Sequence, residues 1–237
     1  MTRINALYSG AEPDEVWPLV RDHHYSGRMP GNIQRCYVAR RPGGLFGDTG
    51  EPTAAVLFSI PPTRWSEPVL ELSRLVRIPT HDRPLSELIA FACRWLNWRD
   101  FNLVVSFADF TQNHHGGIYQ AAGWNFSSFR EPRQDGLVIN GRFVPGRSAN
   151  SRYGTQSPAK LAAALPNSTV ESHWDAGKYL YWRALHRSGD AKAHRLGLER
   201  ASYPKPTAAR RMDAPVPTGS SQAQPLGAAP PIAPEAA

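Results

Sequence analysis

The chain has 237 residues, of which 41% are hydrophobic and seven are tryptophan, so it is long and apolar enough to bury a sizeable core. Its two cysteines, Cys36 and Cys93, lie far apart and outside any Cys-x-x-Cys pair, which argues against a disulfide framework and against a cysteine zinc site. The formal net charge of +7 favours a polyanionic partner such as nucleic acid. No apolar run approaches the roughly 20 residues of a membrane span, and the N-terminus lacks an apolar leader, so we expect a cytoplasmic protein.

The first half of the chain alternates between strand-like and helix-like patterns. Apolar runs with strand-like spacing predict strands at residues 33–41, 53–62, 69–78 and 102–109. Residues 86–99 have helical spacing, with Leu88, Ala92, Trp95 and Leu96 on one face. This alternation predicts an α/β (α+β) fold with at least one parallel strand pair.

The second half predicts shorter elements. Residues 116–124 predict a short helix closed by Gly123, and residues 136–144 predict a hairpin through Asn140-Gly141. Residues 178–185 are expected to form a closing strand or helix. From residue 188 the composition shifts to Ala, Pro, Gly and Ser, which predicts a folded domain at 1–187 and a largely disordered tail at 188–237.

Two polar segments in the first half could carry chemistry. In residues 21–32, His23, His24 and Tyr25 could act as base, metal ligand or proton shuttle, and a surface loop with incidental histidines is the alternative. In residues 71–87, a strand leads into a helix N-terminus beside several arginines, which favours an anion site. Ordinary N-capping by Ser86 is the alternative there.

Two further segments lie in the second half. Asp109 ends a predicted buried strand and could accept a proton, and Tyr119 could donate one. The alternative is that Asp109 caps the next segment. Residues 146–161 are small, polar and basic, which suits contact with a phosphate backbone as well as a flexible surface loop.

Five segments in order resemble the Mom family of phage DNA-modification proteins. They are HHYSGRMPG, ELSRLVRIPTHDRPLSELIAFACRWL, VVSFADFTQNHHGGIYQAAGWNF, GRSANSRYGTQS and KYLYW, and the resemblance covers roughly residues 20–185. It implies a GNAT-like acyltransferase fold, with a mixed central sheet flanked by helices. It also implies a transferase that converts adenine N6 in double-stranded DNA to a carbamoylmethyl (acetamido) adenine, which blocks restriction enzymes. Such a phage or prophage product would act in the host cytoplasm.

The resemblance also assigns functional residues. It implies catalytic roles for His24, Tyr25, Asp109 and Tyr119. It implies a role in holding the group donor for Arg74 and Ser86. We also expect DNA contacts from the positive charges of Arg28, Arg147 and Arg152 and from the aromatic ring of Tyr153.

The donor and any metal stay open at this point. An acyl-CoA-like donor is one possibility, but the segment IPTHDRPLS lacks the glycines of a GNAT phosphate loop. Iron is associated with the family, and the available ligand types are His23, His24, Asp109, His114 and His115.

The chemistry sets two further expectations. Asp109 would take the proton of a poorly nucleophilic N6, and Tyr119 would protonate a thiolate-like leaving group. The base is expected to be flipped out and stacked on Tyr25, Trp65 or Trp124. Two alternatives remain: an N-acetyltransferase acting on a small amine or protein, and a non-catalytic nucleic-acid-binding protein.

Overall fold

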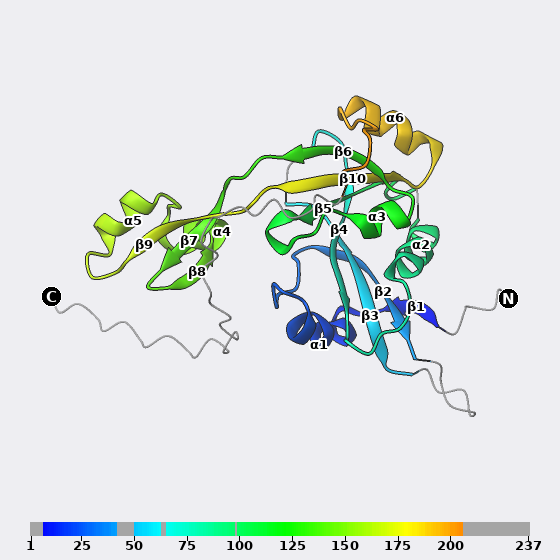
Figure 1. Ribbon diagram of the computed structural model, residues 1–237, viewed down its shortest axis with the longest axis horizontal. Helices are drawn as coiled ribbons and strands as arrows, with labels where there is room; N and C mark the ends of the chain where they lie inside the picture. Colours follow the sequence, from blue (N-terminus) through cyan, green and yellow to red (C-terminus); the bar gives the residue numbers. More distant parts are fainter. Residues whose placement is uncertain (1–6, 42–49, 63–64, 98, 206–237) are drawn as a thin grey trace. The chain divides into compact units, whose positions relative to one another are not determined.

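The computed structural model describes residues 7–41, 50–62, 65–97 and 99–205. In these ranges the chain forms a seven-stranded sheet, a three-stranded sheet and six α-helices (Figure 1). The strands of the large sheet, in spatial order, are β1 (Tyr8–Ala11), β2 (Ile33–Arg40), β3 (Pro52–Ser59), β4 (Leu70–Arg77), β5 (Leu103–Asp109), β10 (Lys178–Ala184) and β6 (Asn125–Arg130). Those of the small sheet are β8 (Arg142–Pro145), β7 (Gln134–Ile139) and β9 (Val170–Trp174).

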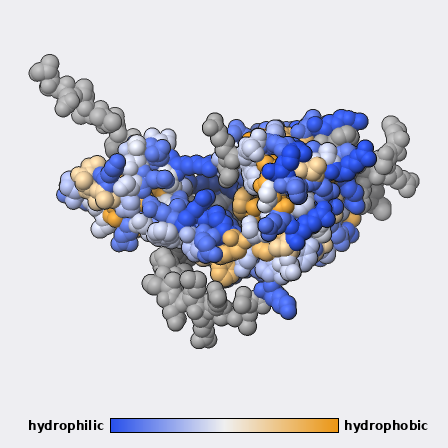
Figure 2. Space-filling model, turned by 90° about the horizontal axis from the view of Figure 1, so that it is seen from above, coloured by the Kyte–Doolittle hydropathy of each residue, from blue (hydrophilic) through white to orange (hydrophobic). Residues whose placement is uncertain are grey.

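The helices join these strands. They are α1 (Pro13–His23), α2 (Leu85–Trp95), α3 (Gly117–Ala121), α4 (Gly146–Tyr153), α5 (Pro158–Ala164) and α6 (Arg187–Arg195), with a 3₁₀ turn, η1 (Phe110–Gln112), before α3. None of the helices in the described part of the chain is long and apolar enough to cross a membrane. The face seen in Figure 2 is mostly hydrophilic, with smaller apolar areas.

Helices cover both faces of the large sheet, which explains the nearly continuous apolar run in β3. Val56 and Phe58 pack in one core cluster with residues of α2. Ala55 and Leu57, which alternate with them, pack in a second cluster with residues of α1. The expected fold class, α/β with a mixed central sheet flanked by helices, is confirmed.

Most of the predicted elements are confirmed, including four strands, α2 and the short helix α3. The predicted hairpin joins β7 to β8 through Asn140 (φ 50°) and Gly141 (φ 75°), a left-handed pair that suits these two residue types. Of the two possibilities predicted for residues 178–185, a strand or a helix, the structure shows the strand, β10. The Gly-rich connection between β2 and β3 lies largely outside the described residues.

Three local predictions are wrong. Ser86 is not the N-cap of α2; that position is Pro84, and no side chain caps the helix. Trp95 does not share the buried face, because it is 51% exposed, and Ile89 and Phe91 are buried instead. Residues 146–161 are not a loop but contribute to α4 and α5, with Ser157 Oγ accepting a hydrogen bond from Lys160 N at the start of α5.

One strand pair of the large sheet is parallel, and it is short. β4 pairs with β5 only at Leu70–Val104 and Glu71–Val105, near the start of each strand. Beyond these pairs the two strands form no ladder, although β4 continues to Arg77 and β5 to Asp109. Strand β10 pairs antiparallel along the whole of β5, from Ala184 opposite Leu103 to Lys178 opposite Asp109. The large sheet therefore opens into a V between β4 and β5.

The predicted end of the folded domain at residue 187 is too early. Residues 187–195 form α6, and Ala193 and Leu198 are buried with Leu103, Val105 and Trp182. The Trp182 Nε1–H also donates to the Glu199 carbonyl at 2.7 Å. Few apolar residues are enough to order this segment, because they pack on an apolar face that the large sheet already provides. The rest of the predicted tail, from residue 206, lies outside the described residues.

Ending the chain at residue 187 rather than at residue 205 is expected to lower the free energy of unfolding by at least about 2 kcal/mol. Trp182 is 2% exposed, and it would lose the cover of Leu198 and Ala193. Urea unfolding of the two shortened chains, followed by tryptophan fluorescence, measures the difference. Equal midpoints would show that α6 and the segment after it contribute nothing to the fold.

Candidate active site

A cavity of about 1090 Å³ occupies the V between β4 and β5. Its walls come from β4, from the end of β5, from the segment that follows α1, and from the turn that joins η1 to α3. Arg130 at the end of β6, Arg133 just before β7 and Arg147 on α4 also line it. The described lining contains six Arg or Lys side chains and two carboxylates, Glu71 and Asp109, so the cavity is cationic overall.

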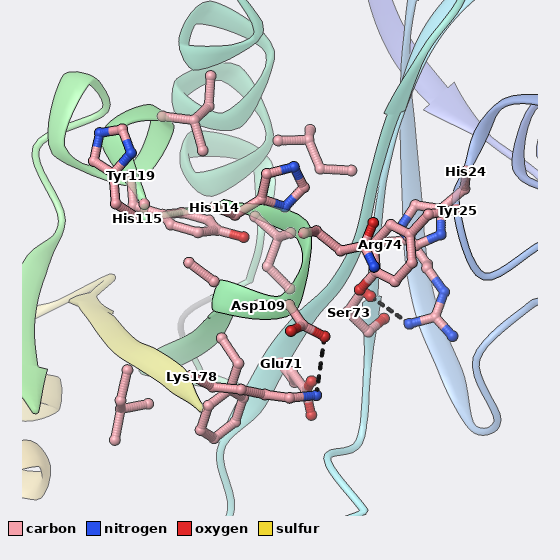
Figure 3. A pocket seen from close by; sticks show the side chains of 18 of the residues that line it. His24, Tyr25, Glu71, Ser73, Arg74, Asp109, His114, His115, Tyr119 and Lys178 are labelled. Atoms are coloured by element: carbon pink, nitrogen blue, oxygen red, sulfur yellow. Dashed lines mark hydrogen bonds and ion pairs between the residues drawn. The ribbon is translucent and has the colours of Figure 1, made fainter. Parts of the chain in front are cut away.

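His24 and Tyr25 follow α1 and line the cavity together (Figure 3). Their rings lie 4.3 Å apart between centroids, and the Tyr25 ring stands edge-on to His114 at 6.3 Å. Tyr25 is 58% exposed, so its side chain is accessible to a ligand. Burial, followed by the negative charge of Asp109, raises the pKa of the Tyr25 hydroxyl.

His24 is held as a neutral ring. Burial, together with the charges of Arg74 and His114, lowers its pKa to about 4. Its Nδ1 accepts a hydrogen bond from the Ser26 backbone N–H at 3.1 Å, which assigns the proton of the neutral ring to Nε2. In this conformation His24 offers a hydrogen-bond donor at Nε2 rather than a base.

The guanidinium of Arg74, which also lines the cavity (Figure 3), is fixed by two backbone carbonyls. Nε donates to Arg28 O at 3.0 Å, and Nη1 donates to Ser73 O at 2.6 Å. Desolvation lowers the pKa of Arg74, which nevertheless stays cationic at neutral pH. Since these bonds use only part of the guanidinium, N–H groups remain for an anionic ligand.

Asp109 has two partners, one for each carboxylate oxygen. Oδ1 accepts from Thr111 N at 3.0 Å and so caps η1. Oδ2 lies 3.4 Å from Nζ of Lys178, the residue of β10 that pairs with Asp109 in the sheet. The capping interpretation of Asp109 is therefore confirmed, and its catalytic role stays a prediction.

Tyr119 stands at the closed end of the V. It is 7% exposed, and burial raises the pKa of its hydroxyl to about 12. Ser106 Oγ lies 2.8 Å from both Tyr119 Oη and Leu72 O. Because Ser106 has a single proton, Tyr119 donates to Ser106 whenever Ser106 donates to the Leu72 carbonyl. This network connects β5, β4 and α3.

Sequence reasoning missed two residues of the site, Glu71 and Lys178. Glu71 stands between the buried Leu70 and Leu72, and a carboxylate between two buried leucines is a signal that could have identified it. Burial raises the pKa of the Glu71 carboxyl, against the opposing charges of Arg74, Lys178 and Arg147. Lys178 carries no local signal, because only the pairing of β10 with β5 brings it to Asp109.

Several predicted residues lie away from the cavity. Its described lining does not include Ser86, Arg28, Arg152 or Tyr153. Tyr153 packs against the apolar core beneath the small sheet, and Arg152 lies over the Tyr153 ring at 5.2 Å. Trp124 is fully buried, so it offers no stacking surface for a base, whereas Tyr25 and Trp65 both line the cavity.

The loop before α2 does not fit the pyrophosphate of an acyl-CoA in the way a glycine-rich loop would. It contains no glycine, and its Pro84 at the N-cap has no amide hydrogen to donate. His81 points inward, with Nδ1 2.9 Å from Thr53 Oγ1, and Arg83 pairs with Glu87 at 3.6 Å. We therefore derive no step through CoA.

The predicted metal ligands do not form a metal site. All five of them line the cavity: His23, His24, Asp109, His114 and His115. Yet in the described ranges no three or more His, Cys, Asp or Glu side chains are grouped so that they could hold a metal ion. His24 also has Nδ1 engaged as an acceptor and a proton on Nε2. We derive no step through iron.

Comparisons with known proteins identify one family. The model described as the Mom protein family matches residues 11–205 of the chain. No curated protein sequence matches it.

Among solved structures, the chain is similar to an acetyltransferase from Bacillus subtilis in complex with CoA, at 11% identity and a TM-score of 0.43, covering 76% of this chain and 98% of that one. It is also similar to an N-acetyltransferase from Staphylococcus aureus Mu50, at 8% identity and a TM-score of 0.41, with coverage of 75% and 96%. A GNAT-family acetyltransferase from Bacillus cereus ATCC 10987 matches at 10% identity and a TM-score of 0.35, with coverage of 76% and 97%.

The low pKa of His24 predicts a pH dependence of stability. The folded state binds the His24 proton only near pH 4, whereas the ordinary value is 6.5, so protonation favours unfolding. Stability from this group is complete above pH 6.5 and is lost as the pH falls towards 4. Urea midpoints should fall less for His24→Asn than for the unchanged chain between about pH 7 and pH 4.5, since Asn keeps an acceptor near Nδ1 but does not titrate. Equal falls would show that His24 is not desolvated.

Proposed function

The chain belongs to the Mom protein family, and on that premise we propose that it modifies the N6 amino group of adenine in double-stranded DNA, giving a carbamoylmethyl (acetamido) adenine that protects the DNA from restriction enzymes. One observation carries the proposal. The cavity between β4 and β5 combines an open aromatic ring, an ion-paired carboxylate and an excess of cationic side chains. The ring would stack on a flipped base, the carboxylate would accept its amino proton, and the cations would bind its phosphates.

The aromatic ring supports recognition of an extrahelical base. An enzyme that reacts at a base atom inside a duplex flips the nucleotide out, at a cost of a few kcal/mol, and stacks it in a pocket. Tyr25 offers an exposed ring whose position is supported by contacts with His24 and His114. A cavity of about 1090 Å³ is large enough for a nucleotide together with a second small group.

Asp109 supports chemistry at N6. The amino lone pair is delocalised into the adenine ring, so bond formation at N6 must be accompanied by loss of a proton. Asp109 Oδ2 would accept that proton, while the bond from Thr111 N to Oδ1 keeps the carboxylate oriented. Lys178, which pairs with Oδ2, would hold the carboxylate in place before the transfer.

Tyr119 fits a different role from the one predicted. Protonating a thiolate whose thiol has a pKa near 8.5 from a tyrosine of pKa about 12 costs roughly 5 kcal/mol, because the two values differ by about 3.5. As a neutral hydroxyl bonded to Ser106, Tyr119 would position the closed end of the cavity and donate a hydrogen bond to charge that develops there.

The cationic lining supports a polyanionic substrate. Arg74, Arg77, Arg130 and Lys178 belong to strands of the large sheet, while Arg133 lies just before β7 and Arg147 lies on α4. Guanidinium groups that face the phosphates on either side of a flipped nucleotide would hold it in register without reading the sequence.

Replacing Asp109 by Asn is expected to abolish the adduct and to leave DNA binding intact. Asn Oδ1 can still accept from Thr111 N, so the variant keeps the cap and removes the proton acceptor. The measurement is mass spectrometry of nucleosides from DNA of cells that express the chain. The unchanged chain should give a modified deoxyadenosine, and Asp109→Asn should reduce it at least about 100-fold.

Two outcomes would contradict this proposal. An adduct at full level with Asp109→Asn would assign the chemistry to another residue. No adduct with the unchanged, folded chain, but acetylation of a small amine in a lysate, would favour an N-acetyltransferase instead.

Arg147→Gln is expected to reduce the slope of log affinity against log salt by about 1, because one phosphate contact is removed. Arg152→Gln is the matched control, since it lies on the same helix, α4, but does not line the cavity. Fluorescence anisotropy with a labelled duplex at several salt concentrations measures both slopes. A loss with Arg152→Gln as large as with Arg147→Gln would place the phosphate contacts along α4 rather than at the cavity.

A further inference from the structure

Asp175 is a buried carboxylate that the proposed reaction does not use. It follows β9, where the chain passes from the small sheet to the large one, and it is 3% exposed. It does not belong to the described lining of the cavity. Burying a charge is costly unless the charge is paired and hydrogen-bonded. An ionised carboxylate at this position therefore depends on its partners.

Both oxygens of Asp175 hold arginines that line the cavity. Oδ2 forms an ion pair with Nη2 of Arg130, the last residue of β6. Oδ1 accepts from the Arg133 backbone N–H at 3.3 Å, and the Asp175 N–H donates to the Arg133 carbonyl at 2.9 Å. The two connections between the sheets are therefore joined here (Figure 1). One carboxylate fixes the guanidinium of Arg130 and the backbone of Arg133.

The Arg130 guanidinium is held at two points. Besides the ion pair with Asp175, its Nη1 donates to the Glu131 carbonyl at 3.1 Å. These bonds occupy two of the five N–H groups of the side chain, so donors remain for a ligand. Guanidinium groups bind phosphate through paired, directional N–H bonds, so their orientation matters as well as their charge. The two bonds of Arg130 fix such an orientation at the wall of the cavity.

The Asp175 carboxylate is itself fixed by the chain that follows it. Oδ1 also accepts from Gly177 N at 3.1 Å, and Gly177 adopts a φ of 98°, a conformation that favours glycine. The Gly177 carbonyl accepts from Phe110 N at 3.1 Å, and Ala176 N donates to Thr111 Oγ1 at 2.9 Å. These bonds attach the segment after β9 to η1. The support for Arg130 therefore belongs to the rigid part of the large sheet.

The ion pair also balances charge across the sheet. Arg130 and Asp109 are the two cross-strand partners of Lys178, so the three residues form one row across β6, β10 and β5. Like charges directly opposite each other repel, and here Arg130 stands opposite Lys178. Asp175 offsets the charge of Arg130, as Asp109 offsets that of Lys178. The two carboxylates thus allow two cations to stand side by side at the cavity.

We propose that Asp175 is a positioning residue for DNA binding: it holds the Arg130 guanidinium in the orientation in which the remaining N–H groups meet a phosphate of the substrate DNA. The proposal rests on the proposed function above, which names DNA as the polyanion that occupies the cavity. Asp175 acts through Arg130 and does not itself line the cavity. Its negative charge alone would weaken binding of a polyanion, so its contribution to affinity comes from orientation.

Replacing Asp175 by Asn isolates this role. Asn Oδ1 still accepts from the N–H groups of Arg133 and Gly177, whereas the amide that replaces Oδ2 cannot accept from Arg130. Loss of one negative charge would alone strengthen binding to DNA. We expect instead about tenfold weaker binding of a labelled duplex with one unpaired adenine, measured by fluorescence anisotropy. Unchanged or tighter binding would overturn the proposal.

Asp190→Asn is the control for loss of an Asp–Arg pair elsewhere. Asp190 lies on α6, outside the described lining of the cavity, and pairs with Arg200 at 2.6 Å. The affinity of this variant for the duplex should stay within about twofold of that of the unchanged chain. A loss as large as with Asp175→Asn would show that the effect is not specific to the Arg130 pair, and the proposal would fail.

A double variant tests whether Asp175 acts through Arg130. Arg130→Gln alone should weaken binding of the duplex about tenfold, and adding Asp175→Asn should cause no further loss. A further loss of about tenfold in the double variant would show that the two residues contribute independently. That result would overturn the proposal.

Arg130→Lys provides a test that does not require Asp175→Asn to fold, since removal of one partner of a buried ion pair is destabilising. Lysine keeps the charge and can pair with Asp175, but it lacks the planar fork that also reaches the Glu131 carbonyl. We expect about tenfold weaker binding. Full affinity of Arg130→Lys would show that charge alone suffices, and orientation by Asp175 would then have no role.

The outcomes distinguish this proposal from the proposed function, because binding of the duplex requires no group donor. Variants that bind as expected, together with no adduct in cells, would retain the role of Asp175 and remove the proposed reaction. Binding by the unchanged chain that none of the variants weakens would remove the role of Asp175 alone. An unchanged chain that does not bind the duplex would remove both.

Discussion

The separation of β4 from β5 is the constraint on which the site depends. The two strands pair only at Leu70–Val104 and Glu71–Val105, and then Ser106 Oγ bonds the Leu72 carbonyl where the next ladder bond would be expected. This side-chain bond closes the end of the V and holds Tyr119 against it. The strands diverge from there, so that each contributes side chains to a shared cavity without a helix or a third strand between them.

Burial shifts the pKa values of several groups in this cavity. Desolvation is the largest cause of the low pKa of His24 and of the raised pKa values of Glu71 and Tyr119. Each shift favours the uncharged form of its group, while the six Arg and Lys side chains of the described lining keep the cavity cationic overall. Such a site suits a neutral heterocycle in its interior, while the arginines at its margin suit the charged backbone attached to that heterocycle.

Much of the fold follows from local sequence patterns, and the parts that do not have physical reasons. Strands 33–40 and 52–59 and the Asn140-Gly141 turn are encoded by side-chain alternation and by positive φ angles, which neighbouring residues determine. Helix α1 escaped prediction because only Val16, Leu19 and Val20 are buried and Pro18 interrupts its interior. Residues 188–205 pack on a surface assembled by β5 and β10, which composition alone does not reveal.

The site shows the same division between local and long-range information. His24, Tyr25, Arg74, Asp109 and Tyr119 were found from sequence, and all of them line one cavity. Lys178 was not found, because it meets Asp109 only when β10 inserts between β5 and β6. That insertion also explains why capping and catalysis are not rival interpretations of Asp109. Its Oδ1 orders the turn that follows β5, and its Oδ2 meets a cation from the neighbouring strand. A carboxylate held at one oxygen by the fold needs little reorganisation before the other oxygen accepts a proton, so the structural bond supports the proposed chemical role.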